Sequence, residues 1–364
     1  MNQYQICVAL GNMSTAGSKA PQDVSVVADR LGYRMVSLSR SAAKRNLYQR
    51  VCEKLNRLTG YFVGWCRAYT TIAENGVVLL QIPNDYTGAW GRKILARLQD
   101  KKGVRLICLI HDVDELRLQE SAYLDHSRQL HNFCMERADA IIAHNESMID
   151  YLVSRGVSKD KLINLEIFDY LAPPAEKELE AFDRSVVIAG NLDPVKCGYV
   201  AQLGTVTGVN WILYGPNYDN GLDTFENITY CGKVPPDVLP EKLTKGFGVI
   251  WDGSSVDSCQ GSMGQYLRYN NPHKLSLYLT AGLPVVIWDQ AAEAAFVRKH
   301  GVGVCVASLQ DLGTAFDSID PDAYNQMAQR VAVLGDQLRN GHYLTAALNG
   351  AAAVCAQTNT NQTR

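Results

Sequence analysis

Two series of short apolar runs, each alternating with longer amphipathic segments, are the feature that most limits how this chain can fold. The first series consists of QICVAL, YRMVSL, GVVLLQIP, VRLICLIHD, ADAIIAHN and KLINLEIFD. The second consists of RSVVIAGN, VNWILYGP, ITYCGKV, FGVIWDG, LPVVIWD and GVGVCV. Strands that alternate with helices pair in parallel and are covered by helices on both faces. We therefore expect an α/β protein made of two doubly wound, Rossmann-like units.

The stretch Leu171-Ala-Pro-Pro-Ala, followed by the charged EKELEAFD, separates the two series and has the composition of a linker. The chain has 364 residues, more than the roughly 250–300 at which single cores stop growing. We expect a first domain over 1–170 and a second over 171–340, with a C-terminal helix at about 340–357 that joins the first domain. Ligands of such sheets bind at the carboxyl ends of the strands, so a cleft between the domains is the expected site.

Charge and cysteine usage exclude several classes of protein. The formal net charge of −2 argues against a general nucleic-acid binder. The ten cysteines form no Cys-x-x-Cys pair, which favours free thiols in a reducing compartment over a disulfide framework. The N-terminus lacks a basic flank, and no apolar run approaches the ~20 residues of a membrane span. We expect a cytoplasmic protein without a membrane span.

The loop GNMSTAGSKAPQD lies between the first strand and a helix expected from about Gln22. Glycines and hydroxyls in such a loop suggest phosphate binding, but the spacing of a P-loop is absent. Two interpretations remain open. One is a structural turn; the other is a mobile loop that closes over a ligand with Ser14, Thr15, Gly17 and Lys19.

The segment LICLIHDVDELR places His111 and Asp112 just past a buried strand. A histidine with an adjacent carboxylate is a candidate general base for proton abstraction. The Asp112-Val-Asp114 spacing also suits a divalent cation, and either aspartate is a candidate helix cap. His126 and His131 lack a carboxylate at metal spacing and are interpreted as surface or packing residues.

The stretch NNPHKLSLYLTAGLPVVIWD predicts a loop, a helix, a turn and a buried strand. Asn271 is the expected N-cap and Pro272 the first helical residue, while Gly282 suits the left-handed turn after the helix. His273 and Lys274 are basic, although the amino end of a helix carries partial positive charge. An anion bound between them and the free N–H groups would account for this pattern, and a solvated lysine is the alternative.

Other polar residues follow strands of the second series. AGNLDPVK supplies Gly190, Asn191 and Lys196, and ILYGPNYDN supplies Tyr214 and Gly215. In the same way, WDGSSVDS supplies Asp252 and Gly253. Lysines, backbone N–H groups and an aromatic ring at one sheet edge are suited to bind a diphosphate and stack a base. We therefore predict a nucleotide site in the second domain.

The stretches YCGKVPPDVLPEKL, FGVIWDG, NNPHKLSLYLTAGLPVVIW and AFVRKHGVGVCV resemble the nucleotide-sugar half of GT-B glycosyltransferases. The similar group contains the bacterial glucosyltransferases that act third on serine-rich repeat adhesins, and relatives labelled β-1,6-galactofuranosyltransferases. STAGSKAPQDV, HDVDELR, ADAIIAHNESM and KLINLEIFDYL resemble the first half of the same family. The resemblance runs over nearly the whole chain and implies two Rossmann-like domains facing a cleft.

The resemblance also implies a function. A UDP-sugar such as UDP-glucose would bind the second domain, and a glycosylated protein acceptor the first, in a cytoplasmic homo-oligomer such as a tetramer. Lys196, Tyr214 and Lys274 would contact UDP. Asn271, Leu275 and Ser276 would lie nearby, and the loop at Thr15 would close on the donor. The family has an arginine where this chain has Lys196, so a point charge would replace a bidentate contact.

With Lys274 on the diphosphate, no metal or other cofactor is required for transfer of a hexose such as glucose or GlcNAc. Galactofuranosyl transfer in polysaccharide synthesis, a UDP-sugar epimerase or hydrolase, and a non-catalytic partner subunit remain alternatives. UDP release that depends on an acceptor would distinguish the transferase from the others.

Overall fold

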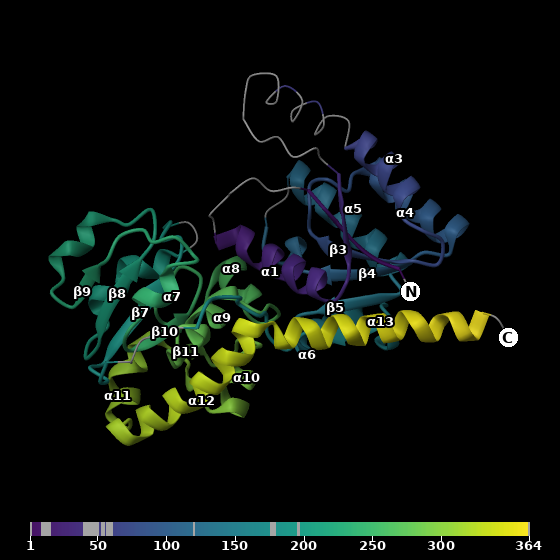
Figure 1. Cartoon of the computed structure of the whole chain (residues 1–364). Helices are drawn as coiled ribbons and strands as arrows, with labels where there is room; N and C mark the ends of the chain where they lie inside the picture. Colours follow the sequence, from purple (N-terminus) through teal and green to yellow (C-terminus); the bar gives the residue numbers. More distant parts are fainter. Residues whose placement is uncertain are drawn as a thin grey trace.

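The chain forms two α/β domains, each built on a six-stranded sheet (Figure 1). A computed structural model describes residues 2–8, 16–38, 51, 55, 61–118, 121–174, 180–194 and 197–362. Except for β1, which begins two residues before the run QICVAL, every strand in these ranges lies within one of the predicted apolar runs, and all neighbouring strands pair in parallel. The expected fold class is confirmed.

The first sheet has the strand order β2-β1-β3-β4-β5-β6. In its longest register, Val77 to Ile82 of β3 lie opposite Arg105 to Ile110 of β4. The elements of this part of the chain are β1 (Gln3–Cys7), α1 (Ala16–Arg30), β2 (Arg34–Ser37), α3 (Phe62–Thr71), β3 (Val77–Ile82), α4 (Ala89–Lys102), β4 (Arg105–Ile110), η1 (Asp114–Leu116), α5 (Ala122–Arg137), β5 (Ala140–Ala143), α6 (Glu146–Ser154), η2 (Lys159–Lys161) and β6 (Leu162–Asn164).

The second sheet has the order β12-β11-β10-β7-β8-β9, so the winding direction reverses between β7 and β10. Such a reversal is the point where doubly wound sheets bind ligands. Its elements are β7 (Ser185–Ala189), η3 (Gly198–Thr205), β8 (Asn210–Tyr214), η4 (Asn220–Thr224), β9 (Ile228–Tyr230), α7 (Leu239–Lys242), β10 (Phe247–Ile250), α8 (Gly261–Tyr266), α9 (His273–Thr280), β11 (Val285–Trp288), α10 (Ala294–His300), β12 (Gly303–Val306), η5 (Leu309–Asp311), α11 (Leu312–Asp317) and α12 (Pro321–Asn340).

The central strands of both sheets are buried on both faces, which explains their nearly continuous apolar sequences. In β3, Val78 and Leu80 belong to the core under α3 and α4. Val77 and Leu79 belong to a second core, which includes α1 and continues into the second domain. The two domains therefore share apolar packing, in addition to the polar contacts described below.

The C-terminal helix α13 (His342–Gln362) leaves the second domain and packs against β4, β5 and α1 of the first (Figure 1). Helix α13 is separated from α12 at Gly341, which has a φ of 79°. Glycine adopts this left-handed conformation without strain and ends α12 there. Neither α13 nor any other helix within the described ranges is long and apolar enough to cross a membrane.

Helix α1 begins earlier than predicted, at Ala16 instead of Gln22, and contains Pro21. Lys19 is therefore a helical residue, one turn before Asp23. Its Nζ lies 2.5 and 2.7 Å from the two carboxylate oxygens of Asp23 and 2.6 Å from the carbonyl oxygen of Leu171. The ammonium thus ties α1 to the segment that connects the domains, and it is not a loop residue reaching for a ligand.

Candidate active site

Lys274, the second residue of α9, lies at the point where the second sheet reverses its winding. Its Nζ is 3.1 Å from Oδ1 of Asp252, just after β10, and only 18% and 12% of the two side chains are exposed. A Cβ added to Gly190, which directly follows β7, would lie 3.5 Å from Cε of Lys274. The lysine therefore spans the loops after β7 and β10, the two strands at the switch point.

The electrostatic surroundings keep Lys274 charged. Burial, the largest single influence, lowers the pKa of Lys274, but the Asp252 carboxylate together with Tyr199, Cys197 and Tyr278 more than offsets it, and the pKa lies well above its ordinary value. The tyrosine Tyr199 is fully buried beside this pair. Its hydroxyl has no hydrogen-bond partner among the described residues. An anion would be bound well here, because the Lys274 ammonium, the unpaired Tyr199 hydroxyl and the amino end of α9 lie together.

Asn271 has a different role from the predicted N-cap. The N-cap position is Pro272, and no side chain caps α9. The Asn271 Nδ2 donates to the carbonyl oxygens of His144 (2.6 Å) and Glu166 (3.1 Å), and its Oδ1 accepts from Nδ2 of Asn145 (2.7 Å). The hydrogen-bonding groups of the Asn271 amide are therefore all used in contacts with the first domain. These contacts hold the start of α9 against the ends of β5 and β6.

The two residues after Lys274 are also structural. Leu275 is completely buried in the core of the second domain. Ser276 Oγ donates to the carbonyl oxygen of Phe168 at 2.5 Å. Of the α9 residues predicted near UDP, the structure brings Lys274 to the switch point and turns Ser276 toward the interdomain segment.

The loops after β7 and β8 are joined to each other. Asn191 Oδ1 accepts from Nδ2 of Asn217 at 2.7 Å. Gly215 has a φ of 144°, and a Cβ there would lie 1.7 Å from the carbonyl oxygen of Gly190, so this approach requires glycine. Asn191 and Gly215 thus shape the sheet edge beside Lys274. Three other predicted donor contacts, Ser14, Thr15 and Lys196, lie outside the described residues, and Gly17 lies in the first turn of α1.

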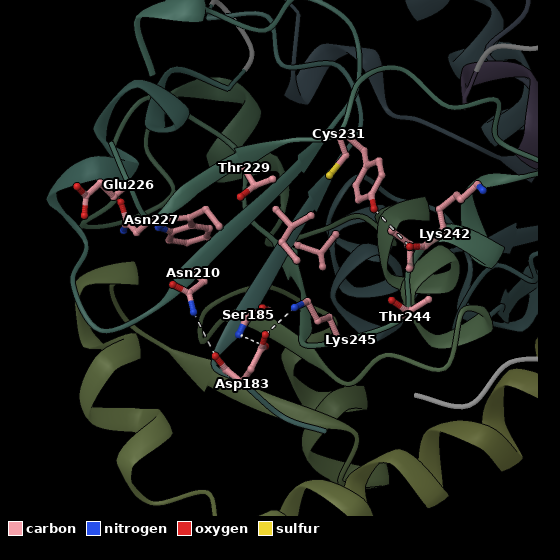
Figure 2. A pocket seen from close by; sticks show the side chains of 15 residues that line it. Asp183, Ser185, Asn210, Glu226, Asn227, Thr229, Cys231, Lys242, Thr244 and Lys245 are labelled. Carbon is pink, nitrogen blue, oxygen red and sulfur yellow. Dashed lines mark hydrogen bonds and ion pairs between the residues drawn. The ribbon is translucent and has the colours of Figure 1, made fainter. Parts of the chain in front are cut away.

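Tyr214 turns away from the strand ends onto the face of the second sheet. It lines a groove of about 410 Å³ with residues of β7, β8, β9 and the segment after α7. Figure 2 shows Asp183 and Lys245 joined within this groove, with Cys231 and Lys242 farther along it. The Tyr214 hydroxyl donates to the Lys242 carbonyl oxygen at 3.3 Å. The Tyr214 ring therefore lies in the groove, whereas Lys274 lies at the edge of the sheet.

His111 follows β4 and faces the second domain across Phe168. The His111 and Phe168 rings stack, with centroids 5.4 Å apart, and the centroid of His273, the first residue of α9, is 6.3 Å from that of Phe168. Burial, helped by the imidazoles of His144 and His273, lowers the pKa of His111 to about 3. The ring is neutral near neutral pH and lies one phenyl ring away from the start of α9.

Asp112 and Asp114 both bind Arg117. Its Nη2 lies 2.9 Å from Asp112 Oδ2 and 2.7 Å from Asp114 Oδ1. Asp114 is buried and also accepts from Oγ of Ser127 at 2.7 Å. The two aspartates of the Asp-x-Asp pattern therefore both bind an arginine. Of the two, Asp112 is accessible to solvent, with 29% of its side chain exposed.

Contacts between the domains bring the two candidate sites together. The Asn271 N–H donates to Nδ1 of His144 at 2.9 Å, and the Val113 N–H donates to the Tyr266 hydroxyl at 2.8 Å. Phe168, His144 and Asn145 were not predicted from the sequence as members of this interface. They could have been found from the segments ADAIIAHN and KLINLEIFD, because both place polar and aromatic residues directly after buried strands.

The chain matches two family models that together span most of its length. The glucosyltransferase 3-like N-terminal domain matches residues 3–167, and the glucosyltransferase 3-like C-terminal domain matches residues 186–351. The chain is 37% identical to the β-1,6-galactofuranosyltransferase WbbI of Escherichia coli over 66% of this chain and 68% of that protein. It is 24% identical to glucosyltransferase 3 of Streptococcus gordonii over 89% of this chain and 90% of that protein.

Solved structures support the fold. The lipopolysaccharide outer core galactosyltransferase WaaB covers 97% of this chain and 99% of its own, with a TM-score of 0.58 at 12% identity. The structure of Anabaena HepE with UDP and glucose covers 97% of this chain and 100% of its own, with a TM-score of 0.57 at 12% identity. Both are GT-B proteins, as the sequence predicts for this chain. The two family models and the relative at 37% identity together show that the chain belongs to the glucosyltransferase 3-like family and is a glycosyltransferase.

Proposed function

We propose that this enzyme transfers a hexosyl residue from a UDP-sugar to a sugar hydroxyl, without a divalent cation. The observation that carries the proposal is the partly buried Lys274 ammonium at the winding reversal of the second sheet, beside the uncapped start of α9. The diphosphate would lie against this helix start, where Lys274, backbone N–H groups and the orphaned Tyr199 hydroxyl would contact it. Asp252 would hold the ammonium in place. Lys196 remains a predicted contact.

In the proposed reaction, Lys274 acts mainly on the leaving group. As the bond between the sugar C1 and the β-phosphate oxygen breaks, negative charge grows on that oxygen, and the nearby ammonium stabilises it more than it stabilises the intact donor. On the other side of the cleft, His111 would accept the proton of the attacking hydroxyl. Asp112 is the alternative base, but its carboxylate already forms an ion pair with Arg117.

Two donor and acceptor pairs are favoured. One is glucose or GlcNAc transferred to a glycosylated, serine-rich adhesin, supported by similarity to glucosyltransferase 3 over 89% of the chain. The other is galactofuranose transferred to a growing polysaccharide, supported by the higher identity of 37% to a galactofuranosyltransferase. On identity alone, the galactofuranosyl donor is favoured.

The test is a panel of UDP-glucose, UDP-GlcNAc and UDP-galactofuranose, each with a GlcNAc-bearing peptide or a free oligosaccharide acceptor. UDP release and product mass are measured with and without EDTA. Acceptor-dependent release that persists in EDTA is expected. Release without acceptor would instead indicate a hydrolase, and loss in EDTA would contradict the metal-free mechanism and make Asp112 and Asp114 candidate metal ligands.

We further propose that the enzyme works in the cytoplasm as a homo-oligomer, as similarity to the family suggests. Light scattering coupled to size-exclusion chromatography would measure the mass, for which a tetramer of the 40.1 kDa chain is expected. Fractionation of the source cells would test the location.

A further inference from the structure

A buried glutamine contacts the candidate base. Gln81 lies on β3 and is 8% exposed, within a strand whose other residues are all apolar. Its Oε1 is 2.7 Å from Nε2 of His111. On the other side, its Nε2 donates to the Pro21 carbonyl oxygen (3.3 Å) and to Ser25 Oγ (3.2 Å), both in α1.

These contacts fix which nitrogen of His111 carries the proton. A carbonyl oxygen cannot donate, so the Gln81 amide must present its NH₂ group to Pro21 and its oxygen to His111. The oxygen accepts, and therefore Nε2 of His111 is the protonated nitrogen. The neutral ring then has its lone pair on Nδ1, which makes no hydrogen bond to any residue that the structure describes.

The other two imidazoles around Phe168 show that this arrangement is specific. His144 uses both nitrogens: Nε2 donates to the Ile110 carbonyl oxygen at 3.0 Å, and Nδ1 accepts from the Asn271 N–H. His273 Nε2 donates to a backbone carbonyl, that of Asp169. His111 differs from both, because its proton is held by a side chain that can be replaced without altering the backbone.

We propose that Gln81 is a positioning residue that holds His111 in its Nε2–H tautomer, so that Nδ1 is free to receive the proton of the acceptor hydroxyl. This rests on the proposed function. As the acceptor oxygen bonds to C1 of the sugar, the bond from C1 to the β-phosphate oxygen breaks and its electron pair leaves with UDP. The hydroxyl proton moves to Nδ1, and the resulting imidazolium keeps its Nε2–H bond to Gln81 until it releases a proton to water.

The low basicity of His111 is compatible with this role. Once the acceptor oxygen has begun to bond to C1, its proton is strongly acidic, and a weak base suffices if the proton leaves late. The diphosphate of the bound donor also brings negative charge into the cleft, which favours the imidazolium. The requirement for this role is that the lone pair of the neutral His111 ring is on Nδ1.

The chain offers a matched control. Gln5, on the neighbouring strand β1, is 1% exposed, and its Nε2 donates to the Ser25 carbonyl oxygen at 3.1 Å. It therefore contacts the same helix as Gln81, from the same sheet, without touching a histidine. Gln5→Met and Gln81→Met remove similar buried amides, but only the second removes the acceptor for His111.

The experiment combines kinetics with ¹⁵N NMR of histidine-labelled protein. The chain has seven histidines, and a His111→Gln variant assigns the His111 signals. In Gln81→Met, we expect the population of the Nε2–H tautomer to fall and that of the Nδ1–H tautomer to rise. We also expect kcat to fall about tenfold to a hundredfold, while KM for the UDP-sugar stays within about twofold of the parent value. Gln81→Glu keeps an acceptor oxygen, so it should restore the tautomer and most of kcat and move the acidic limb of the pH profile upward. Gln5→Met should change neither the tautomer nor kcat.

Different results would contradict the role of Gln81 and the proposed function. An unchanged tautomer in Gln81→Met would overturn the assignment to Gln81, and so would a changed tautomer with an unchanged kcat. If the parent protein transfers no sugar from any donor of the panel, the proposed function fails, while the NMR signals still report whether Gln81 sets the tautomer. Melting temperatures of both methionine variants show whether lost folding explains a lost kcat.

Discussion

At the residue scale, the pair formed by Lys274 and Asp252 leads to the first prediction. Lys274→Met should lower kcat/KM about tenfold to a hundredfold, because a charge-assisted contact contributes roughly 1.5–3 kcal/mol. UDP should also raise the melting temperature of the variant less than that of the parent. Lys299→Met is the control, since Lys299 forms a 3.3 Å ion pair but is 66% exposed. Normal turnover of Lys274→Met would mean that this lysine is not part of the donor site.

The same pair predicts an effect on stability. Lys274→Met leaves the Asp252 carboxylate buried without its counter-ion, and should lower the free energy of unfolding by about 1–3 kcal/mol. The double variant Lys274→Met/Asp252→Asn removes both charges and should recover part of this loss, as measured by urea unfolding. Additive losses from Lys274→Met and Asp252→Asn would show that the two groups do not interact.

The sequence placed Lys274 and Asp252 at the same sheet edge but did not predict that they form an ion pair. A lysine at a helix start is mildly unfavourable by itself, so the pattern indicated an anionic ligand there instead of an aspartate of the chain. Ser276 lies in α9 as predicted, whereas Asn271 lies just before the helix and is not its N-cap, and the hydrogen bonds of both run to residues more than 100 positions away. Local patterns position a residue on an element; they do not indicate what packs against it.

At the scale of elements, strands were predictable because burial on both faces demands an all-apolar run. The start of α1 was not, because Pro21 and several polar residues obscure its periodicity. What stabilises this turn is the contact of Lys19 with Asp23 and with Leu171, which is 152 positions away. The C-terminal helix was expected from about residue 340, and Gly341, with a φ of 79°, ends α12 there.

Gly341 gives the third prediction. A Cβ there would lie 2.7 Å from Cγ2 of Val27 in α1, whereas Gly32, with a φ of 86°, has nothing within 4 Å of such a Cβ. Gly32→Ala should therefore cost only the backbone strain of about 1–2 kcal/mol, and Gly341→Ala should cost at least about 1 kcal/mol more. Urea unfolding of the two variants measures the difference, and equal losses would show that α1 accommodates the methyl group.

Asp169 gives a prediction of pH dependence. It is fully buried and accepts from the N–H groups of Tyr343 (3.3 Å) and Leu344 (2.6 Å) at the start of α13. Burial raises the pKa of Asp169 from 3.8 to about 7, despite these hydrogen bonds. A raised pKa stabilises the fold at pH below the unfolded value, and this stabilisation is lost as pH rises toward 7.

Asp169→Asn cannot ionise, so it isolates that contribution. The melting temperature of the parent minus that of Asp169→Asn should fall as pH rises from about 4 to about 7, and then stay level. A constant difference across this range would show that Asp169 does not take up a proton on folding.

At the scale of the whole molecule, Asn271 tests how the domains are held together. Asn271→Ala removes hydrogen bonds to Asn145, His144 and Glu166 at once, and leaves their polar groups buried. We expect weaker UDP binding and a larger radius of gyration in X-ray scattering. Asn210→Ala, at an exposed position of the second domain, should match the parent. An unchanged scattering curve for Asn271→Ala would show that the apolar contacts suffice to hold the domains together.

The two-domain architecture was the most predictable property of the molecule, because it depends on twelve separate runs that each demand burial. The contacts that join the domains were not predictable. They depend on single rings and amides, such as Phe168 between His111 and His273, whose positions follow from the packing of distant elements.

The chain passes between the domains twice, once after Phe168 and once at Gly341, and the two passages are bonded to each other. The Tyr170 N–H donates to the Leu338 carbonyl oxygen at 3.3 Å, and Asp169 receives the first N–H groups of α13. Two connections bonded to each other form a hinge that permits rotation about the line joining them and resists twisting. We therefore expect any relative motion of the domains to be rotation about this line, which would change the distance between Lys274 and His111.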